Sequence, residues 1–512
     1  MADLPRLLHV GVTLAPALHE RVRVIPIDAG RQIEEALAEL LRDLGIDAQP
    51  AVLLGEGTTA DQLIGLRVAG VTCRFPAQTA SAAFSYVTGT AQLPGVASLA
   101  DRLGDLSPRL AAELVALTCR AAVSAQPELL AGPGTASPDT AEPARAALRL
   151  GISLAGLATV AAETAADAER LIAALAPETI TVHVEPGLLR DLTLAAGAVD
   201  MFQFLREGLF AEVGLPLPSI RLRPDPSLRP GGFAARFNAV RLLPRIALPD
   251  GMILVNDTDS SMAERGFEAL ATLNPTTLMP AALVDARHEE TLVEQGFTTW
   301  DRTGYVILSI AQDLREHLHQ VVTRDVAAEL TRLVGGLFPV LETAAARYVP
   351  PESLAPVLRE LLAAQVPVRN LRRILEILVR QETDPASSTS LDRVTAVRHG
   401  LADVIASRAS RQTGTAVVYL LDKEATLAVA AMNGDEPEDG AGATAARLGA
   451  GLRAELAHLP SAAWAPVLLT SDETRAPLAR ALRPEFPRLV VLGMGDLPPD
   501  WNVQPVARVS LG

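Results

Sequence analysis

Three kinds of short stretch carry residue types that could hold a metal ion or a phosphate. They are the pair His317 and His319, the acidic run DTDSS at residues 257–261, and two Gly-rich tetrapeptides that begin at Gly89 and Gly493. Residues two positions apart on a helix point to different faces, so the histidine pair would need further ligands from elsewhere. The acidic run lacks the spacing and the final Glu of a calcium loop. Neither Gly-rich stretch has the Gly-Lys-Ser/Thr ending of a phosphate loop. We therefore predict a surface helix and ordinary turns at these places, with no metal site and no bound cofactor.

The other reactive side chains do not assemble into a catalytic motif either. Lys423 is the only lysine of the chain and is not near a Gly-rich loop. The acidic residues are scattered, so no pair can be assigned as general acid and general base. Cys73 and Cys119 stand among apolar residues and are predicted to be buried, reduced thiols. We expect a protein without catalytic residues that is not an enzyme, and an unrecognised active site is the remaining alternative.

The composition is that of a globular protein with several domains. The 512 residues are 49% hydrophobic and 21% charged, and this length favours roughly two to four domains. A net charge of −15 disfavours nucleic acids and anionic membrane surfaces, because both attract cationic proteins. The longest apolar stretch, residues 150–162, is too short to span a bilayer, and the N-terminus has no signal-peptide pattern. We expect a cytoplasmic protein that meets a membrane only through a partner.

Two regions of the first half begin with the same pattern. A strand-like run starts at Leu8 and again at Val182, and an amphipathic helix follows each run. Gly45 and Gly214 come next, where a helix that ends in a left-handed conformation favours glycine. Because the pairing needs a one-residue gap, an internal duplication and chance both explain it. The predicted buried stripes are Ile33, Leu37, Leu40, Leu41 and Leu44 in the first helix, and Phe202, Leu205, Leu209, Phe210 and Val213 in the second.

Residues 327–378 have the pattern of a helical region. Pro367 stands where a helix can begin, because the first turn does not need the N–H group that proline lacks. Apolar residues recur on one side of the helix that follows, and the arginines between them are expected to face solvent. The predicted core positions are Val368, Leu371, Leu375 and Leu378, and the arginines are Arg369, Arg372 and Arg373.

The last part of the chain alternates helix and strand patterns and predicts a compact α/β domain. Residues 417–421 and 489–492 are continuously apolar, as expected of strands that are covered on both faces. Ser471 and Asp472 are good caps for the helix before the last of these strands, and Pro477 is tolerated near its start.

Three segments match long sequence patterns of one known family. The first is VPVRNLRRILEIL at residues 366–378, with Asn370 where Asp is usual. The second is the closing strand–helix–strand unit, which begins at Pro466 and includes PVLLTSDETR and PPDWNV. The third and weaker one, at residues 274–302, contains NPTTLMPAALVD and EQGFTTWDR. From about Thr181 to the C-terminus, the chain resembles the cytosolic domain of the large export-gate protein of flagellar and type III secretion systems.

The resemblance implies an α/β (α+β) fold of several subdomains, with small α/β subdomains and one helical subdomain. Members of the family form a nonameric ring under the export pore and have no known catalytic residues. Their membrane-spanning helices have no counterpart in this sequence. The expected domains are 1–123, an N-terminal α/β region for which a degenerate copy of the first subdomain is one of the two explanations above; 124–147, a linker; 148–326, the first subdomain with a small α/β subdomain inserted at about 255–305; 327–390, the helical subdomain; and 391–512, the C-terminal α/β subdomain.

The resemblance also implies a protein-binding cleft with altered residues. Asn274, Thr277 and Leu308 stand where flagellar members have Asp, Phe and Thr, and residues 309–311 replace Thr-His-Leu. The cleft thus lacks the aromatic anchor of the kind that often dominates interface energy. We expect a component of protein export at the inner membrane that forms a homo-oligomeric ring and binds export substrates, chaperones or export-apparatus subunits. The alternative is a stand-alone scaffold or regulatory protein that kept the fold but left export.

Overall fold

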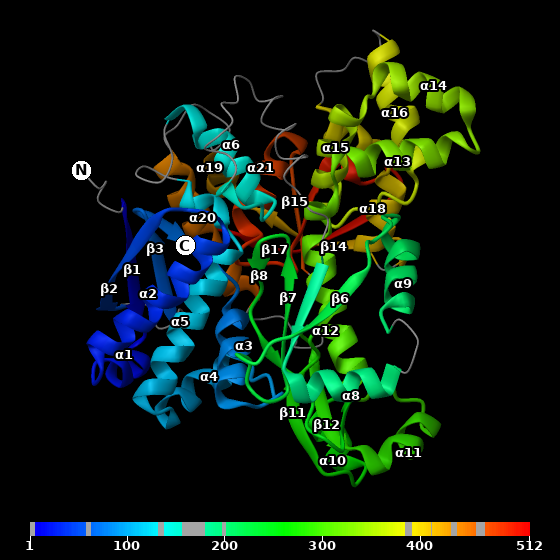
Figure 1. Ribbon diagram of the computed structural model, residues 1–512. Helices are drawn as coiled ribbons and strands as arrows, with labels where there is room; N and C mark the ends of the chain where they lie inside the picture. Colours follow the sequence, from blue (N-terminus) through cyan, green and yellow to red (C-terminus); the bar gives the residue numbers. More distant parts are fainter. Residues whose placement is uncertain are drawn as a thin grey trace. The chain divides into compact units, whose positions relative to one another are not determined.

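Figure 1 shows the computed structural model of the chain. The chain divides into two compact units. The first unit is Met1–Arg206 with Pro218–Arg315, and the second is Glu207–Leu217 with Glu316–Gly512. Both combine helices with β-sheets, which confirms the predicted α/β (α+β) class with several subdomains. Among the described residues, no helix is both long enough and apolar enough to cross a membrane. The structure describes residues 6–57, 63–131, 138–155, 180–196, 201–384, 392–410, 412–431, 438–456 and 466–512.

Residues 6–131 form a sheet with helices, which we call the N-terminal module. Its sheet has the order β2-β1-β3-β4, in which β2 is parallel to β1 and the other neighbours are antiparallel. Both cysteines are buried free thiols, as predicted. The elements are β1 (Arg6–Leu14), α1 (Pro16–Val22), α2 (Pro26–Asp43), β2 (Ala48–Glu56), β3 (Ile64–Val68), β4 (Val71–Cys73), α3 (Ala77–Thr88), α4 (Val96–Arg102), the 3₁₀ helix η1 (Leu103–Asp105), α5 (Pro108–Ser124) and the 3₁₀ helix η2 (Pro127–Leu130).

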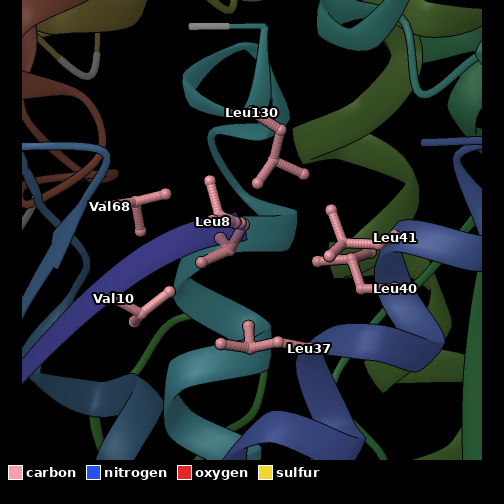
Figure 2. A pocket seen from close by; sticks show the side chains of 8 residues that line it. Leu8, Val10, Leu37, Leu40, Leu41, Val68 and Leu130 are labelled. Carbon is pink, nitrogen blue, oxygen red and sulfur yellow. The ribbon is translucent and has the colours of Figure 1, made fainter. Parts of the chain in front are cut away.

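The core of this module is apolar and closely packed. The predicted stripe of α2 is confirmed, since each of its five residues is at most 2% exposed. Side chains from α2, β1, β3 and the end of the α5 region converge on one apolar space that is too narrow for a water molecule (Figure 2). This space is therefore part of the core and not a ligand site. Its lining residues are Leu8, Val10, Leu37, Leu40, Leu41, Val68, Val123 and Leu130.

The segment 124–147, expected to be a linker, contains helical structure. It includes η2 and most of α6 (Pro138–Arg149), while residues 132–137 lie outside the described part of the chain. Ala144 and Ala147 are buried, so α6 contributes to the interior of the first unit.

Residues 180–196, 201–206 and 218–246 of the first unit form a second module, and its four main strands have the same topology as the first sheet. Residues 207–217, which include Gly214, belong to the second unit. Its strand order is β6-β5-β7-β8, with β6 parallel to β5 and the other neighbours antiparallel. Gly45 and Gly214 both have a positive φ after the second helix of their module, +68° and +87°. This shared topology is what an internal duplication would leave. The elements are β5 (Ile180–Val184), α8 (Pro186–Ala196), α9 (Gln203–Val213), β6 (Ile220–Pro224), β7 (Gly232–Phe237), β8 (Val240–Arg241) and β9 (Arg245–Ile246), which pairs with β7.

One residue of the stripe predicted for α9 is wrong. Phe202, Leu209 and Val213 are buried and Leu205 is half-buried, but Phe210 is 51% exposed. Phe210 follows Leu209 directly and is therefore turned about 100° from it around the helix axis. Hydrophobicity alone could not show that this aromatic side chain lies outside the core, because the amphipathic pattern of α9 is irregular.

A small antiparallel sheet is inserted after the second module, and we call it the insert. Its strand order is β11-β12-β10-β13, so β11 is an outer strand. The acidic run at 257–261, predicted to be a turn, instead starts a helix, because Thr258 accepts a hydrogen bond from the Ser261 N–H at 3.1 Å. The elements are β10 (Met252–Val255), α10 (Asp259–Glu264), β11 (Ala269–Leu273), β12 (Pro280–Asp285), the 3₁₀ helix η4 (Ala286–His288), α11 (Glu289–Glu294) and β13 (Thr299–Trp300); α12 (Arg302–His317) follows.

The second unit begins with a helical region. The predicted core stripe of α16 is confirmed, with Val368, Leu371, Leu375 and Leu378 between 0% and 7% exposed. The start predicted at Pro367 is wrong, because α16 begins at Leu371 after the cap Asn370, whose side chain accepts from the Arg373 N–H. The elements are the 3₁₀ helix η5 (Leu318–Val321), α13 (Arg324–Gly335), α14 (Pro339–Tyr348), α15 (Pro351–Ala363) and α16 (Leu371–Thr383).

The C-terminal part is a parallel sheet with helices. Its strand order is β16-β15-β14-β17, and all three pairings are parallel. Val417 on β14 is 50% exposed, so the prediction that this strand is covered on both faces is wrong at that position. The elements are α17 (Arg393–Gly400), α18 (Ala402–Ala409), β14 (Thr415–Leu421), α19 (Lys423–Ala431), α20 (Glu438–Leu456), β15 (Val467–Thr470), α21 (Asp472–Leu482), β16 (Val490–Gly493), the 3₁₀ helix η6 (Met494–Asp496) and β17 (Asn502–Val509).

Candidate functional site

Asn274 anchors the loop between β11 and β12. Its side-chain oxygen accepts hydrogen bonds from the N–H groups of Thr276 at 2.9 Å and Thr277 at 3.2 Å. Its own N–H donates to the Met279 carbonyl at 2.9 Å. Asn274 is only 2% exposed, so its side chain shapes the loop from inside. Thr277 is half-buried, as are its neighbours Thr276 and Leu278, so this part of the loop is partly accessible.

The structure brings Leu308 next to the same loop. The Thr276 hydroxyl donates to the Leu308 carbonyl on α12 at 3.2 Å. Leu308 is half-buried, whereas residues 309–311 are buried, with Ser309 and Ile310 at 0% exposure. The predicted cleft residues therefore form one neighbourhood. Within it, Thr277 and Leu308 are partly accessible, and the changes at residues 309–311 fall in the interior. A role for these residues in binding stays a prediction.

The inner side of α12 is polar where it meets β9. Arg245 on β9 forms an ion pair with Asp313 at 2.6 Å, and its guanidinium also donates to the Ser309 carbonyl at 3.4 Å. Tyr305 on the same helix is only 3% exposed, and burial raises the pKa of its hydroxyl. These contacts fix the helix that carries Leu308 against the second module.

The first sequence signature, VPVRNLRRILEIL, forms a joint inside the second unit. The Val368 N–H donates to the Val213 carbonyl at 2.8 Å, and the Arg369 guanidinium donates to the Ala211 carbonyl at 2.8 Å. A Cβ on Gly214 would come within 2.2 Å of the Arg369 Cα, which no side chain could avoid. Arg369 was expected only to face solvent, but it holds the segment 207–217 to the helical region.

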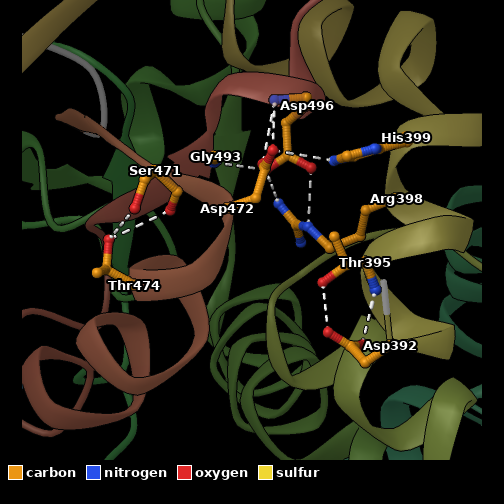
Figure 3. Close-up of polar contacts among 10 residues, drawn as sticks. Asp392, Thr395, Arg398, His399, Ser471, Asp472, Thr474, Gly493 and Asp496 are labelled. Atoms are coloured by element: carbon orange, nitrogen blue, oxygen red, sulfur yellow. Dashed lines mark hydrogen bonds and ion pairs between the residues drawn. The ribbon is translucent and has the colours of Figure 1, made fainter. Parts of the chain in front are cut away.

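The second signature surrounds a buried ion pair (Figure 3). Arg398 on α17 binds both carboxylate oxygens of Asp496, with Nε–Oδ1 at 2.9 Å and Nη2–Oδ2 at 2.5 Å. The two side chains are 2% and 1% exposed. Asp496 also accepts the Gly493 N–H at 2.8 Å. The Gly-rich stretch at 493–496, predicted to be a turn, is therefore a 3₁₀ turn that carries the carboxylate of the pair.

Further charged and polar groups line the same interior. Arg475 on α21 is 4% exposed, and burial followed by the nearby Arg398 charge lowers its pKa to about 10. Asp392 caps α17 through the Thr395 N–H and hydroxyl, at 3.0 and 2.7 Å. Beside them, Asp472 accepts the Gly495 N–H at 3.0 Å and lies 3.2 Å from His399 (Figure 3). This cluster joins α17, α21 and the turn after β16.

Ser471 does not cap α21 as predicted. It occupies the N-cap position, but its side chain contacts the Thr474 hydroxyl at 2.8 Å and makes no capping bond to the backbone. Asp472 reaches the turn at Gly495, as described above.

No group of three or more His, Cys, Asp or Glu side chains that could hold a metal ion occurs among the described residues. His319, paired with His317 in the sequence, has an enclosed Nδ1, and burial together with the Arg483 charge holds its pKa well below the ordinary value. The Arg398–Asp496 pair, with side chains only 2% and 1% exposed, is closed to solvent and so does not offer an open ligand site.

Sequence reasoning missed this ion pair for a physical reason. Arg398 and Asp496 are 98 residues apart in the sequence. Neither belongs to a sequence motif that would have shown its charge to be buried. The sequence signal at that place was the Gly-rich stretch at 493–496. Glycine is needed there because the side chains of Asp472 and His399 approach the backbone closely.

Comparison with known proteins places the geometry in a family. The Ralstonia nicotianae "Hypersensitivity response secretion protein HrcV" is 32% identical over 258 residues, which is 49% of this chain and 36% of that protein. The chain thus spans little more than a third of the length of this relative. The structure of the Chlamydia pneumoniae CdsV protein has the same fold, with a TM-score of 0.57 and 20% identity over 65% of this chain and 97% of that one. Nonameric EPEC SctV-C matches with a TM-score of 0.50 and 16% identity, over 65% of this chain and 99% of that one.

The comparisons cover the region in which the signatures lie. The FHIPEP family model matches residues 144–502, which includes the second module, the insert, the helical region and most of the C-terminal sheet. The N-terminal module lies outside this match. The match takes in well over half of the sequence, and the chain is therefore a member of the FHIPEP family.

Proposed function

We propose that the chain is a non-enzymatic, protein-binding component of flagellar or type III protein export. The observation that carries this proposal is the family match over residues 144–502. It is supported by the position of the two long signatures, one at the Gly214–Arg369 joint and one around the Arg398–Asp496 pair.

The proposed partners are export substrates, chaperones or other subunits of the export apparatus. Among the relatives, CdsV has been solved in a complex with CdsO, and SctV-C has been solved as a nonamer. By analogy we propose a homo-oligomeric ring for this chain. Its proposed place is the cytoplasmic side of the inner membrane, reached through these partners.

The proposed binding surface is the neighbourhood of Thr277 and Leu308. Both residues are half-buried, and the Asn274 loop fixes their relative position through Thr276. Neither side chain is aromatic or charged. A partner would therefore bind by packing and by hydrogen bonds to the loop.

The experiment is affinity capture of the tagged chain from its native cell. We expect the wild-type chain to recover export-apparatus subunits or secreted proteins, and Leu308→Arg to recover fewer, because a charge would have to be desolvated at the surface. Leu53→Arg is the matched control, since Leu53 is 73% exposed in the N-terminal module. If the wild-type chain recovers no export protein at all, the alternative of a stand-alone scaffold replaces the proposal.

A further inference from the structure

The insert has an outer strand whose open edge lies beside the candidate cleft. β11 pairs with β12 on one side only, and it leads directly into the Asn274 loop. Outer strands expose backbone groups that can pair with another extended chain, so proteins often cover such edges. Thr272 on this strand is only 5% exposed, whereas Leu270 is 51% exposed and Ala271 is exposed, so the strand is covered at Thr272 and open before it.

The cover comes from the N-terminal module. The loop between α3 and α4, residues 89–95, makes two hydrogen bonds to β11. The Gln92 side-chain amide donates to the Ala271 carbonyl at 2.6 Å, and the Leu93 N–H donates to the Thr272 hydroxyl at 3.1 Å. One bond uses the backbone of the strand, and the other uses the backbone of the loop. We call residues 89–95 the edge loop.

The edge loop is held in shape by local contacts. Gly89 ends α3 with φ at +72°, and the Thr90 N–H donates a hydrogen bond to the Ser85 carbonyl at 3.0 Å. The Gln92 N–H donates to the Thr90 hydroxyl at 3.1 Å, and Pro94 is buried. A loop that is ordered before it meets β11 loses little conformational entropy in that contact.

The helix before the edge loop is fixed to the second module. The Tyr86 hydroxyl on α3 accepts the Arg229 N–H at 3.1 Å. The Arg229 guanidinium in turn binds both oxygens of Glu113 on α5, at 2.6 and 2.7 Å. The N-terminal module therefore holds the second module through Tyr86 and Glu113, and the insert through the edge loop.

We propose that the edge loop is a built-in strap that holds the end of β11 at Ala271 and Thr272 and restrains the insert against the rest of the first unit. The strap occupies the Ala271 carbonyl, and it limits movement of the loop that carries Asn274 and Thr277. The proposal concerns the restraint alone and does not depend on a role in export. It also gives the N-terminal module, which lies outside the family match, a defined task.

The experiment is hydrogen exchange of the whole chain, read by mass spectrometry on peptides that cover residues 267–280. The test variant is Gln92→Ala with Thr272→Val, which removes both bonds and keeps the shape of the strand side chain. We expect exchange in 267–280 to become about tenfold faster, because each hydrogen bond contributes modestly to closing the segment. Exchange in β14, in the other unit, should not change.

The matched control is Gln295→Ala with Thr298→Val, two exposed positions of the insert away from the edge loop. It should leave exchange in 267–280 at the wild-type rate. Unchanged exchange in the test variant would overturn the proposal. If the test variant loses protection throughout the chain, Gln92→Ala alone decides: faster exchange confined to 267–280 supports the strap, and wild-type exchange overturns it.

Discussion

Removal of the Asp496 carboxylate should strongly destabilise the second unit. Asp496 binds Arg398 through two hydrogen bonds, and it also accepts the Gly493 N–H. Arg475 lies in the same interior, and the charge of Asp496 is one of the influences that support its protonated form. Asp496→Ala would therefore leave two buried arginines without their shared counter-charge.

The expected loss follows from the burial of the pair. Both side chains are at most 2% exposed, so water cannot replace the lost carboxylate. Breaking a buried ion pair by removing one partner costs about 3–5 kcal/mol in unfolding free energy. Asp496→Asn should cost less than Asp496→Ala, because the amide oxygen can still accept one of the bonds.

Urea unfolding followed by tryptophan fluorescence provides the assay. Trp501 lies in the second unit, close in sequence to Asp496, and packs against its core. Replacing Trp300 and Trp464 by Phe leaves Trp501 as the single reporter. The midpoint and slope of its transition give the change in unfolding free energy of this unit.

The chain provides a matched control on the same helix. Arg393 on α17 binds the Glu382 carboxylate at 2.6 Å, but these side chains are 41% and 36% exposed. Glu382→Ala should therefore cost less than about 1 kcal/mol. The reasoning is refuted if Asp496→Ala and Glu382→Ala have the same small effect.

Two further predictions concern the second unit. Gly214→Ala should destabilise this unit by more than Gly414→Ala. Both glycines have a positive φ, which an alanine adopts only with strain, but only at Gly214 would the added Cβ also collide with the Arg369 backbone. The same urea assay measures both variants, and equal losses would contradict the close approach. The stability of this unit should also fall as the pH drops below about 6.5, because unfolded His319 takes up a proton that its lowered pKa excludes in the folded state. His319→Gln should reduce this dependence between about pH 7 and pH 5, and an unchanged slope would contradict it.

Periodicity predicted the regular parts of the fold well. The stripes of α2 and α16 are buried because each helix has one continuous apolar side that packs on a core. Helix starts were less predictable. Pro367 can begin a helix, yet α16 begins only after its cap Asn370. The reason is that Val368, which precedes the cap, donates a hydrogen bond to Val213 in the segment that contains Gly214. Local propensity cannot show such a tertiary contact.

The candidate site was predictable only as a neighbourhood. The resemblance brought Asn274, Thr277 and Leu308 together, and the structure joins them through Thr276. The sequence could not show that Asn274 points into its own loop. It also could not show that the edge loop reaches β11, since Gln92 and Ala271 are 179 residues apart and belong to regions with no common motif.

The central claim is that the chain acts in protein export, and the secreted proteins of the native cell test it most directly. The experiment deletes the gene and compares the proteins of the culture medium, with and without the gene, by quantitative mass spectrometry. The account predicts that a defined set of exported proteins is lost from the medium and stays inside the cell, and that the wild-type gene restores their export. An unchanged set of secreted proteins, under conditions in which the chain is expressed, would contradict it.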